Sequence, residues 1–413
     1  MIKHSTMLLP NNVRLVLSED KSKNQTYAEI SVLYGGMTEK YKYQEKKKKI
    51  TPGLAHLMEH YLVEHNLYGN MFDYLKDQYV EFNATTNAKK TCFFINTVFD
   101  FERHLEELIK IVNVPIFDAD ALEKTKKPII EEIKRTADRP YVKFTKKMND
   151  CTYHDCKFRE TTGTIENVKS IKIEELEEVH NLFYQPENQV IFIAGNFDSK
   201  KIIKKITEIY ESINRKKYEY EILDKKETAK VRRKKGHVKD SKFDDLITIS
   251  FKIDLKKLTP KERVKLTFYL SHFLSYNFND SSKVYQELIK EKDTIYSLST
   301  STSFFIKDIC FLDISMYGNN LKKFKRLVFD VIKNKYTDKE LFDLWKKETL
   351  INVVVREGRC VSSGLAYLDN ILTFDYLDVD KIGDIEKFSI EDFKSTLDKL
   401  DFSNYCIVSQ TKK

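Results

Sequence analysis

Hydrophobic and polar positions along the first half of the chain switch repeatedly between a two-residue period and a helical period. Short runs rich in β-branched and aromatic residues predict strands where turn residues bound them. Apolar residues that recur every three to four positions predict helices. We therefore expect strands over 12–20, 26–36, 189–197 and two runs within 80–98, and helices over 53–65, 70–78, 101–114, 121–137 and 198–214.

The second half of the chain repeats a similar order of elements. Its patterns predict strands over 246–253, 295–305 and 309–318, and helices over 259–278, 282–292, 321–335 and 338–358. Between the halves, residues 214–243 are polar and charged with few candidates for burial, which is typical of a linker.

Chain length agrees with two domains, since 413 residues exceed one ordinary core and suit two domains of about 200 residues each. We predict a first half over 1–213, a linker over 214–243 and a second half over 244–413. The repeated order of elements indicates an internal structural duplication. The predicted fold class is α+β: two structurally similar halves, each a mainly antiparallel sheet covered by helices, joined by the linker.

Composition narrows the function classes. Hydrophobic residues make up 41% of the chain, so disorder is not expected. The net charge of +8 comes from 71 basic and 63 acidic residues spread along the chain, and no nucleic-acid-binding module accompanies them, so a nucleic-acid partner is not expected. No run approaches the roughly 20 apolar residues of a membrane span, and the N-terminal apolar run is too short for a signal peptide. Six scattered cysteines suit reduced thiols, and we expect a cytoplasmic protein.

Candidate chemistry concentrates in the run "GLAHLMEHYLVEH", which holds three of the nine histidines. His56, Glu59 and His60 have i, i+3, i+4 spacing, so their side chains share one helical face. Both imidazoles can then reach one zinc ion with a carboxylate beside it. The motif H-x-x-E-H is short, and a polar helix face without metal is the alternative reading. The matching helix of the second half carries a lone His272, which is typical of a core or interface histidine.

Three segments in order, "GLAHLMEHYL", "FNATTNAKKTCFF" and "PIIEEIKR", resemble the pitrilysin or insulinase family of zinc peptidases. Within that family the likeness is greatest to the shorter bacterial and mitochondrial processing-peptidase branch. The resemblance extends over nearly the whole chain, through "GTIENVKSIKIEELEEVHNLFYQPENQVIFIAGNF" and "SSKVYQELIKEKDTIYSLST".

The resemblance implies that the first half is the metal-binding, catalytic half. His56 and His60 would bind one zinc ion per chain, Glu132 would be the third ligand, and Glu59 would be the general base. Glu131 lies about 100° round the helix from Glu132 and should point elsewhere. Pro128 is a departure from the family, which usually has an uninterrupted helix here. A proline should kink the helix or start it at that point. We expect Glu64 and His65 either to contact the ligand side chains or to lie on the surface.

The strand "FNATT" resembles the family's edge strand, which pairs with the backbone of a bound peptide. Asn83, Ala84 and Thr85 are therefore the predicted substrate contacts, and an ordinary internal strand is the alternative. In the second half the family has an arginine followed seven residues later by a tyrosine, an anchoring pair that holds the substrate. Tyr296 fits the tyrosine, but position 289 is isoleucine and only Lys290 next to it is basic.

Together these features predict a zinc-dependent endopeptidase that hydrolyses short or unfolded peptides, either in general peptide degradation or in the processing of one peptide precursor. A non-catalytic peptide-binding scaffold subunit of the same fold is the alternative. Because the arginine of the anchoring pair is missing, we expect a dimer with a related subunit that supplies it. A homodimer that uses Lys290 and Tyr296 is the other possibility.

Overall fold

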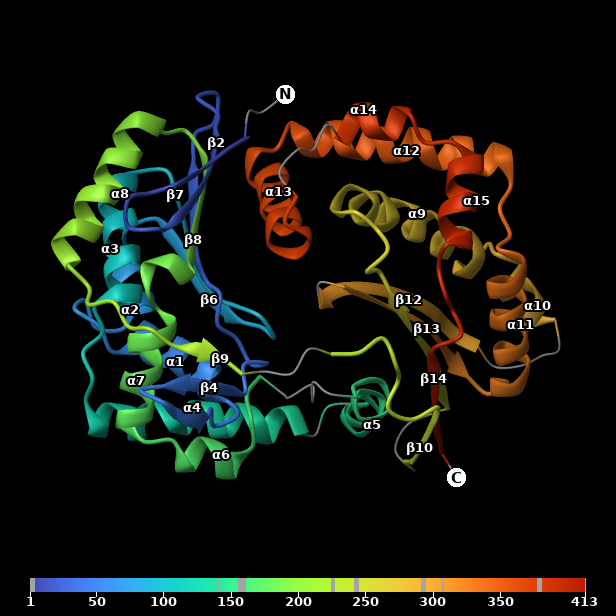
Figure 1. The fold of residues 1–413 in the computed structure, drawn as a ribbon, viewed down its shortest axis with the longest axis horizontal. Coiled ribbons are helices and arrows are strands. Elements are labelled where there is room, and N and C mark those ends of the chain that lie inside the picture. Colours follow the sequence, from blue (N-terminus) through green and yellow to red (C-terminus); the bar gives the residue numbers. More distant parts are fainter. Residues whose placement is uncertain are drawn as a thin grey trace. The chain divides into compact units, whose positions relative to one another are not determined.

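The computed structural model describes residues 4–137, 139, 141–154, 161–223, 227–240, 245–290, 295–306, 308–376 and 381–412. The chain forms two compact units (Figure 1). The first unit comprises Met1–Ala137, Arg159–Asp224 and Arg356–Leu368, and the second comprises Asp138–Phe158, Lys225–Val355 and Asp369–Lys413. Each unit therefore includes a segment from the other half of the sequence. The predicted domain boundaries at 213 and 243 stay a prediction.

The first unit is built on a six-stranded sheet with the order β1-β2-β8-β3-β7-β6. Its strands are β1 (His4–Leu8), β2 (Arg14–Glu19), β3 (Thr26–Val32), β6 (Val80–Thr86), β7 (Thr91–Thr97) and β8 (Gln189–Gly195). All neighbours are antiparallel except β2 and β8. Strand β6 lies at the edge and pairs only with β7.

Helices cover one face of this sheet, and α3 and α8 lie side by side on it (Figure 1). The helices of the first unit are α1 (Leu54–Glu64), α2 (Met71–Leu75), α3 (Phe101–Asn113), α4 (Ala119–Ala137), α6 (Ile165–Ser170), α7 (Ile173–Phe183) and α8 (Ser199–Ile213). Alternation along β3 sends Ala28, Ile30 and Val32 into the core beneath the helices, where Leu57 of α1 is fully buried. The core therefore fixes α1 against the sheet.

The segment predicted as a linker contributes a strand to each unit. Strand β9 (Glu221–Ile222) extends a lysine-rich hairpin of the first unit, made of β4 (Lys40–Tyr43) and β5 (Lys46–Lys49). Strand β10 (Lys235–Lys239) pairs in parallel with β14 (Tyr405–Thr411) of the second unit.

The second unit has a five-stranded sheet with the order β10-β14-β11-β13-β12, in which β11 is Leu246–Asp254, β12 is Ile295–Ile306 and β13 is Ile309–Gly318. Its helices are α5 (Val142–Thr152), α9 (Pro260–Phe278), α10 (Lys283–Ile289), α11 (Leu321–Asn334), α12 (Lys339–Glu357), α13 (Cys360–Phe374), α14 (Lys381–Glu386) and α15 (Ile390–Asp398); α12 ends and α13 begins within the first unit. The α+β prediction, with two similar halves and mainly antiparallel sheets, is confirmed.

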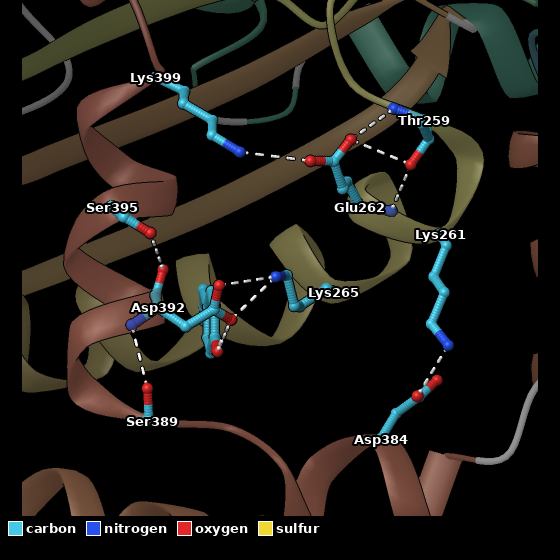
Figure 2. A network of polar contacts seen from close by, with 10 residues as sticks. Thr259, Lys261, Glu262, Lys265, Asp384, Ser389, Asp392, Ser395 and Lys399 are labelled. Carbon is cyan, nitrogen blue, oxygen red and sulfur yellow. Dashed lines mark hydrogen bonds and ion pairs between the residues drawn. The ribbon is translucent and has the colours of Figure 1, made fainter.

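Helix α9 begins where the sequence predicts it, because Thr259 and Glu262 form a capping box at its N-terminus. Glu262 accepts hydrogen bonds from the backbone N–H of Thr259 at 2.8 Å and from its hydroxyl at 3.0 Å. The ammonium of Lys265 lies 3.0 and 2.8 Å from the two carboxylate oxygens of Asp392 and so joins α9 to α15 (Figure 2). Local capping and a half-exposed ion pair thus hold this helix in place.

No helix in the described part of the chain is long and apolar enough to cross a membrane. The cytoplasmic location predicted from the sequence stays a prediction.

Candidate metal centre

Helix α1 begins at a glycine that its surroundings require. Gly53 has a φ of 95°, in the left-handed region that favours glycine, and a Cβ there would meet the carbonyl oxygen of Thr162 at 2.6 Å. Beyond Gly53, nine of the eleven residues of α1 are buried. His56 and Glu59 are among them, with 9% and 8% of their surfaces exposed, while His60 is half-buried. The histidine run is therefore a largely enclosed helix rather than a solvated polar face.

The structure brings His56, His60 and Glu132 together. One ligand atom from each side chain can be chosen so that all three atoms lie within 4.8 Å of one another. Nε2 of His56 lies 3.7 Å from Oε2 of Glu132, and the centroids of the two imidazole rings are 4.7 Å apart, with the ring planes at 78° to each other. Among the residues that the structure describes, this is the one such group of three or more.

Glu132 reaches this group from α4, which runs without interruption through Pro128. Of the two outcomes expected at Pro128, a helix start is wrong, because α4 begins nine residues earlier, at Ala119, and a kink stays a prediction. Glu131 points away, as expected, since it is exposed and forms an ion pair of 2.7 Å with Lys134.

The three side chains fit a zinc ion. Two imidazole nitrogens and one carboxylate oxygen form the donor set of many zinc sites that keep an open position. Nδ1 of His56 is buried without a hydrogen-bond partner in the described residues. Burial, and next the positive charge of His60, lower the pKa of His56 to about 4, so its ring is neutral at pH 7 and can offer a lone pair.

The pKa of the second histidine, His60, shifts in the opposite direction. Burial lowers the pKa of His60, but a contact with Glu64 and the charges of Glu59, Glu64 and Glu132 outweigh it, and the net direction is upward. A ring surrounded by carboxylates lies in a negative potential, which favours a bound cation.

Glu59 stands beside the group and is held by a residue that the sequence analysis did not select. The hydroxyl of Thr86, the last residue of β6, donates a hydrogen bond of 2.5 Å to Oε2 of Glu59. Burial raises the pKa of Glu59, and the charge of Glu132 adds to this, although the bond from Thr86 and the charge of His60 act against it. A carboxylate with a raised pKa is a better proton acceptor near neutral pH.

The predicted substrate residues lie on the edge strand, not on an internal strand. Asn83 and Thr85 are exposed and Ala84 is buried, in the alternation expected for β6. The backbone N–H of Ala84 donates to the side-chain oxygen of Asn83 at 2.9 Å rather than to β7. Since residues of an antiparallel pair direct their N–H and C=O alternately toward and away from the partner, the main chain of Ala84 faces the open edge.

The residues predicted for the anchoring pair are described only in part. Ile289 is the last residue of α10 and is 41% exposed, and Lys290 after it is ion-paired with Glu287. Tyr296 lies in β12, and its side chain is outside the described residues. The role of Tyr296 stays a prediction.

Comparison with known proteins relates this chain to a family of peptidases. A sequence model of the insulinase family, peptidase family M16, matches residues 14–164, and a model of the M16 inactive domain matches residues 170–347. The chain is 27% identical over 290 residues to an uncharacterized zinc protease, YmfH, from Bacillus subtilis, a match that covers 68% of this chain and 67% of that protein.

Two solved structures show the same fold. An M16-like peptidase from Alicyclobacillus acidocaldarius superposes with a TM-score of 0.86 and 19% identity, over 99% of this chain and 98% of that one. A chain of complex III2 from Candida albicans superposes with a TM-score of 0.74 and 12% identity, over 100% of this chain and 96% of that one. The fold thus occurs both in a peptidase and within a multisubunit assembly.

Proposed function

Because this chain belongs to the pitrilysin/insulinase family of peptidases, M16, we propose that it is a zinc-dependent endopeptidase that hydrolyses short or unfolded peptides. The observation that carries the proposal is the group of His56, His60 and Glu132 with the carboxylate of Glu59 beside it. The names of the relatives, which include zinc proteases, support the same reading.

His56, His60 and Glu132 would hold the ion. Bound there, zinc would polarise the carbonyl of a peptide bond and lower the pKa of a water molecule to about 7. Glu59 accepts the proton of the attacking water and passes it to the leaving amine. Thr86 keeps the Glu59 carboxylate oriented for both transfers.

The open edge of β6 supports a substrate that is extended. A peptide that adds to this edge forms main-chain hydrogen bonds at Ala84 and its neighbours, which demand little of side-chain identity. A folded protein cannot offer such a free strand, so short and unfolded peptides are the expected substrates.

The test combines metal content with hydrolysis. Glu59→Gln should retain about one zinc per chain and lose at least about a hundredfold in the rate of peptide cleavage, because the amide keeps the shape and cannot accept the proton. The double variant His56→Ala, His60→Ala should lose both zinc and activity. Glu131→Gln is the matched control, since Glu131 is the exposed neighbour of Glu132.

Elemental analysis and mass spectrometry of a digested peptide mixture give the two readouts. Full zinc occupancy in the double histidine variant, or normal cleavage by Glu59→Gln, would refute the proposal.

A second candidate is a non-catalytic peptide-binding subunit. The match of residues 170–347 to the M16 inactive domain favours it for the second half of the chain. It predicts that the protein binds extended peptides without cleaving them, even when loaded with zinc. The histidine run argues for catalysis, because a binding subunit has no use for a metal site with a carboxylate beside it.

For assembly, we propose that the active form pairs this chain with a second chain of the same fold. Position 289 carries isoleucine where the family has arginine, and Lys290 next to it is ion-paired with Glu287, so no planar donor stands at the place of the family's arginine. A different, metal-free subunit with the complete arginine–tyrosine pair would supply it, and a homodimer is the alternative. Expression of the chain alone, with measurement of mass and activity, decides between them: a fully active homodimer that is insensitive to Tyr296→Phe excludes the heterodimer.

A further inference from the structure

Glu64 lies one helical turn after His60 on α1, and its carboxylate approaches Nδ1 of the His60 ring. Oε1 of Glu64 is 3.8 Å from Nδ1 of His60, an electrostatic contact rather than a hydrogen bond. Both side chains are about three-quarters buried, with 28% of His60 and 26% of Glu64 exposed. In such a partly desolvated setting, a carboxylate favours the tautomer with its proton on the nearer ring nitrogen.

The other oxygen of the same carboxylate is held from a second helix. Thr125 of α4 is fully buried, and its hydroxyl lies 3.1 Å from Oε2 of Glu64 and 3.2 Å from the carbonyl oxygen of Ala121. The single hydroxyl proton goes preferentially to the carboxylate, because charge-assisted hydrogen bonds are the stronger ones. His65 also approaches Oε2, with Nε2 at 3.8 Å.

This position links the two helices that carry the candidate ligands. Thr125 precedes Glu132 by seven residues, or about two helical turns, so it lies on a similar side of α4. Pro128 lies between them and removes one backbone hydrogen bond from α4. A side-chain contact from α1 to α4 next to that point stabilises the placement of Glu132 relative to His56 and His60.

We propose that Glu64 is a positioning residue for the metal group: it holds the His60 ring with the Nδ1 proton toward itself and Nε2 toward His56 and Glu132, and with Thr125 it fixes α4 against α1. The inference rests on the proposed function, since it assigns a role relative to the zinc ligands. It predicts that Glu64 acts on metal affinity without touching metal or substrate.

The test measures zinc affinity by competition with a chromophoric chelator. Glu64→Gln keeps the size of the side chain and removes its charge, and it should weaken zinc binding about tenfold to a hundredfold, as is usual for partners of metal-ligating histidines. Thr125→Val should also weaken zinc binding, whereas Thr125→Ser, which keeps the hydroxyl, should bind zinc as the unaltered protein does. Glu131→Gln is the matched control and should bind zinc as the unaltered protein does.

Two further readouts separate positioning from a general loss of stability. The visible absorption of the cobalt-substituted protein should change in Glu64→Gln, because the ligand field depends on the orientation of the His60 ring, and should be unchanged in Glu131→Gln. Wild-type zinc affinity and cobalt spectrum in Glu64→Gln overturn the inference, as does a lowered melting temperature in Thr125→Val with unaltered affinity. If His56→Ala, His60→Ala also binds zinc normally, the proposed function itself fails.

Discussion

Thr86 donates a hydrogen bond of 2.5 Å from its hydroxyl to a carboxylate oxygen of Glu59, and so connects the end of the edge strand to the proposed general base. The bond restricts the carboxylate to one orientation on a helix that is itself fixed in the core. Strand β6 therefore has two roles in the proposed mechanism: its open edge receives the peptide and its last residue orients the base.

We expect Thr86→Val to lower kcat about tenfold to a hundredfold with a smaller change in KM, since misplacing a catalytic group slows the chemical step more than it weakens binding. Steady-state kinetics on one defined peptide measures both constants. Thr207→Val on α8 is the control, because it makes the same change at a half-buried threonine whose hydroxyl donates to the carbonyl oxygen of Ile203 and not to Glu59. Equal kcat values for the two variants would contradict the orienting role of Thr86.

Ala84→Pro should raise KM at least about tenfold while zinc content and melting temperature stay near those of the unaltered protein. The substitution removes the N–H that faces the open edge, and proline is tolerated on edge strands at such positions. Peptide titration and thermal unfolding of the same preparation provide the measurement. An unchanged KM would show that peptides bind elsewhere than along β6.

The free energy of unfolding should decrease as the pH is lowered, because His272 is buried. His272 is 2% exposed and packs against the rings of Trp345, Phe342 and Phe393. Burial lowers the pKa of His272 to about 4 from its ordinary value near 6.5. Between these pH values His272 is protonated in the unfolded chain and neutral in the folded chain. The free energy of unfolding therefore decreases as pH falls from about 6.5 to about 4, by on the order of 2–3 kcal/mol.

Denaturant unfolding across this pH range measures the effect. His272→Phe should make the profile less steep in the window, with His56 keeping its own share, although it also gives up the hydrogen bond of 3.1 Å to Thr337. Control measurements on His237→Phe should retain the slope, because His237 is exposed. A profile that is equally steep in both variants assigns the pH dependence to other groups.

Lys252 is fully buried in the second unit and ion-paired with Glu227, with its ammonium 2.9 Å from the carbonyl oxygen of Lys230. Lys252→Met should reduce the free energy of unfolding by about 3–5 kcal/mol, since it takes away the ammonium that neutralises the buried carboxylate of Glu227. Lys265→Met, which breaks the half-exposed pair with Asp392 seen in Figure 2, should cost only about 0–1 kcal/mol.

The double variant Lys252→Met, Glu227→Leu completes the cycle. It should be more stable than Lys252→Met alone, because no isolated charge is left in the interior. If the single and double variants unfold at the same denaturant concentration, desolvation of Glu227 is not the cause of the loss.

Much of the fold was determined by local patterns. Helical periodicity located α1 and α9, because it depends on neighbours within one or two turns. The spacing of His56, Glu59 and His60 put them on one helical face for the same reason. Glu132 was selected through the family resemblance and not from spacing, since nothing local connects it to residues more than seventy positions earlier.

Tertiary structure decided what depends on distant contacts. The hydrogen bonds of Thr86 with Glu59 and of Thr125 with Glu64 form only in the folded chain. No periodic pattern in the sequence connects the residues of either pair. Tertiary structure also exchanged segments between the halves, since Asp138–Phe158 joins the second unit and Arg356–Leu368 joins the first. Sequence periodicity reports which face of an element is apolar, but the partner that buries this face is chosen by packing of the whole chain, and that choice is made only in three dimensions.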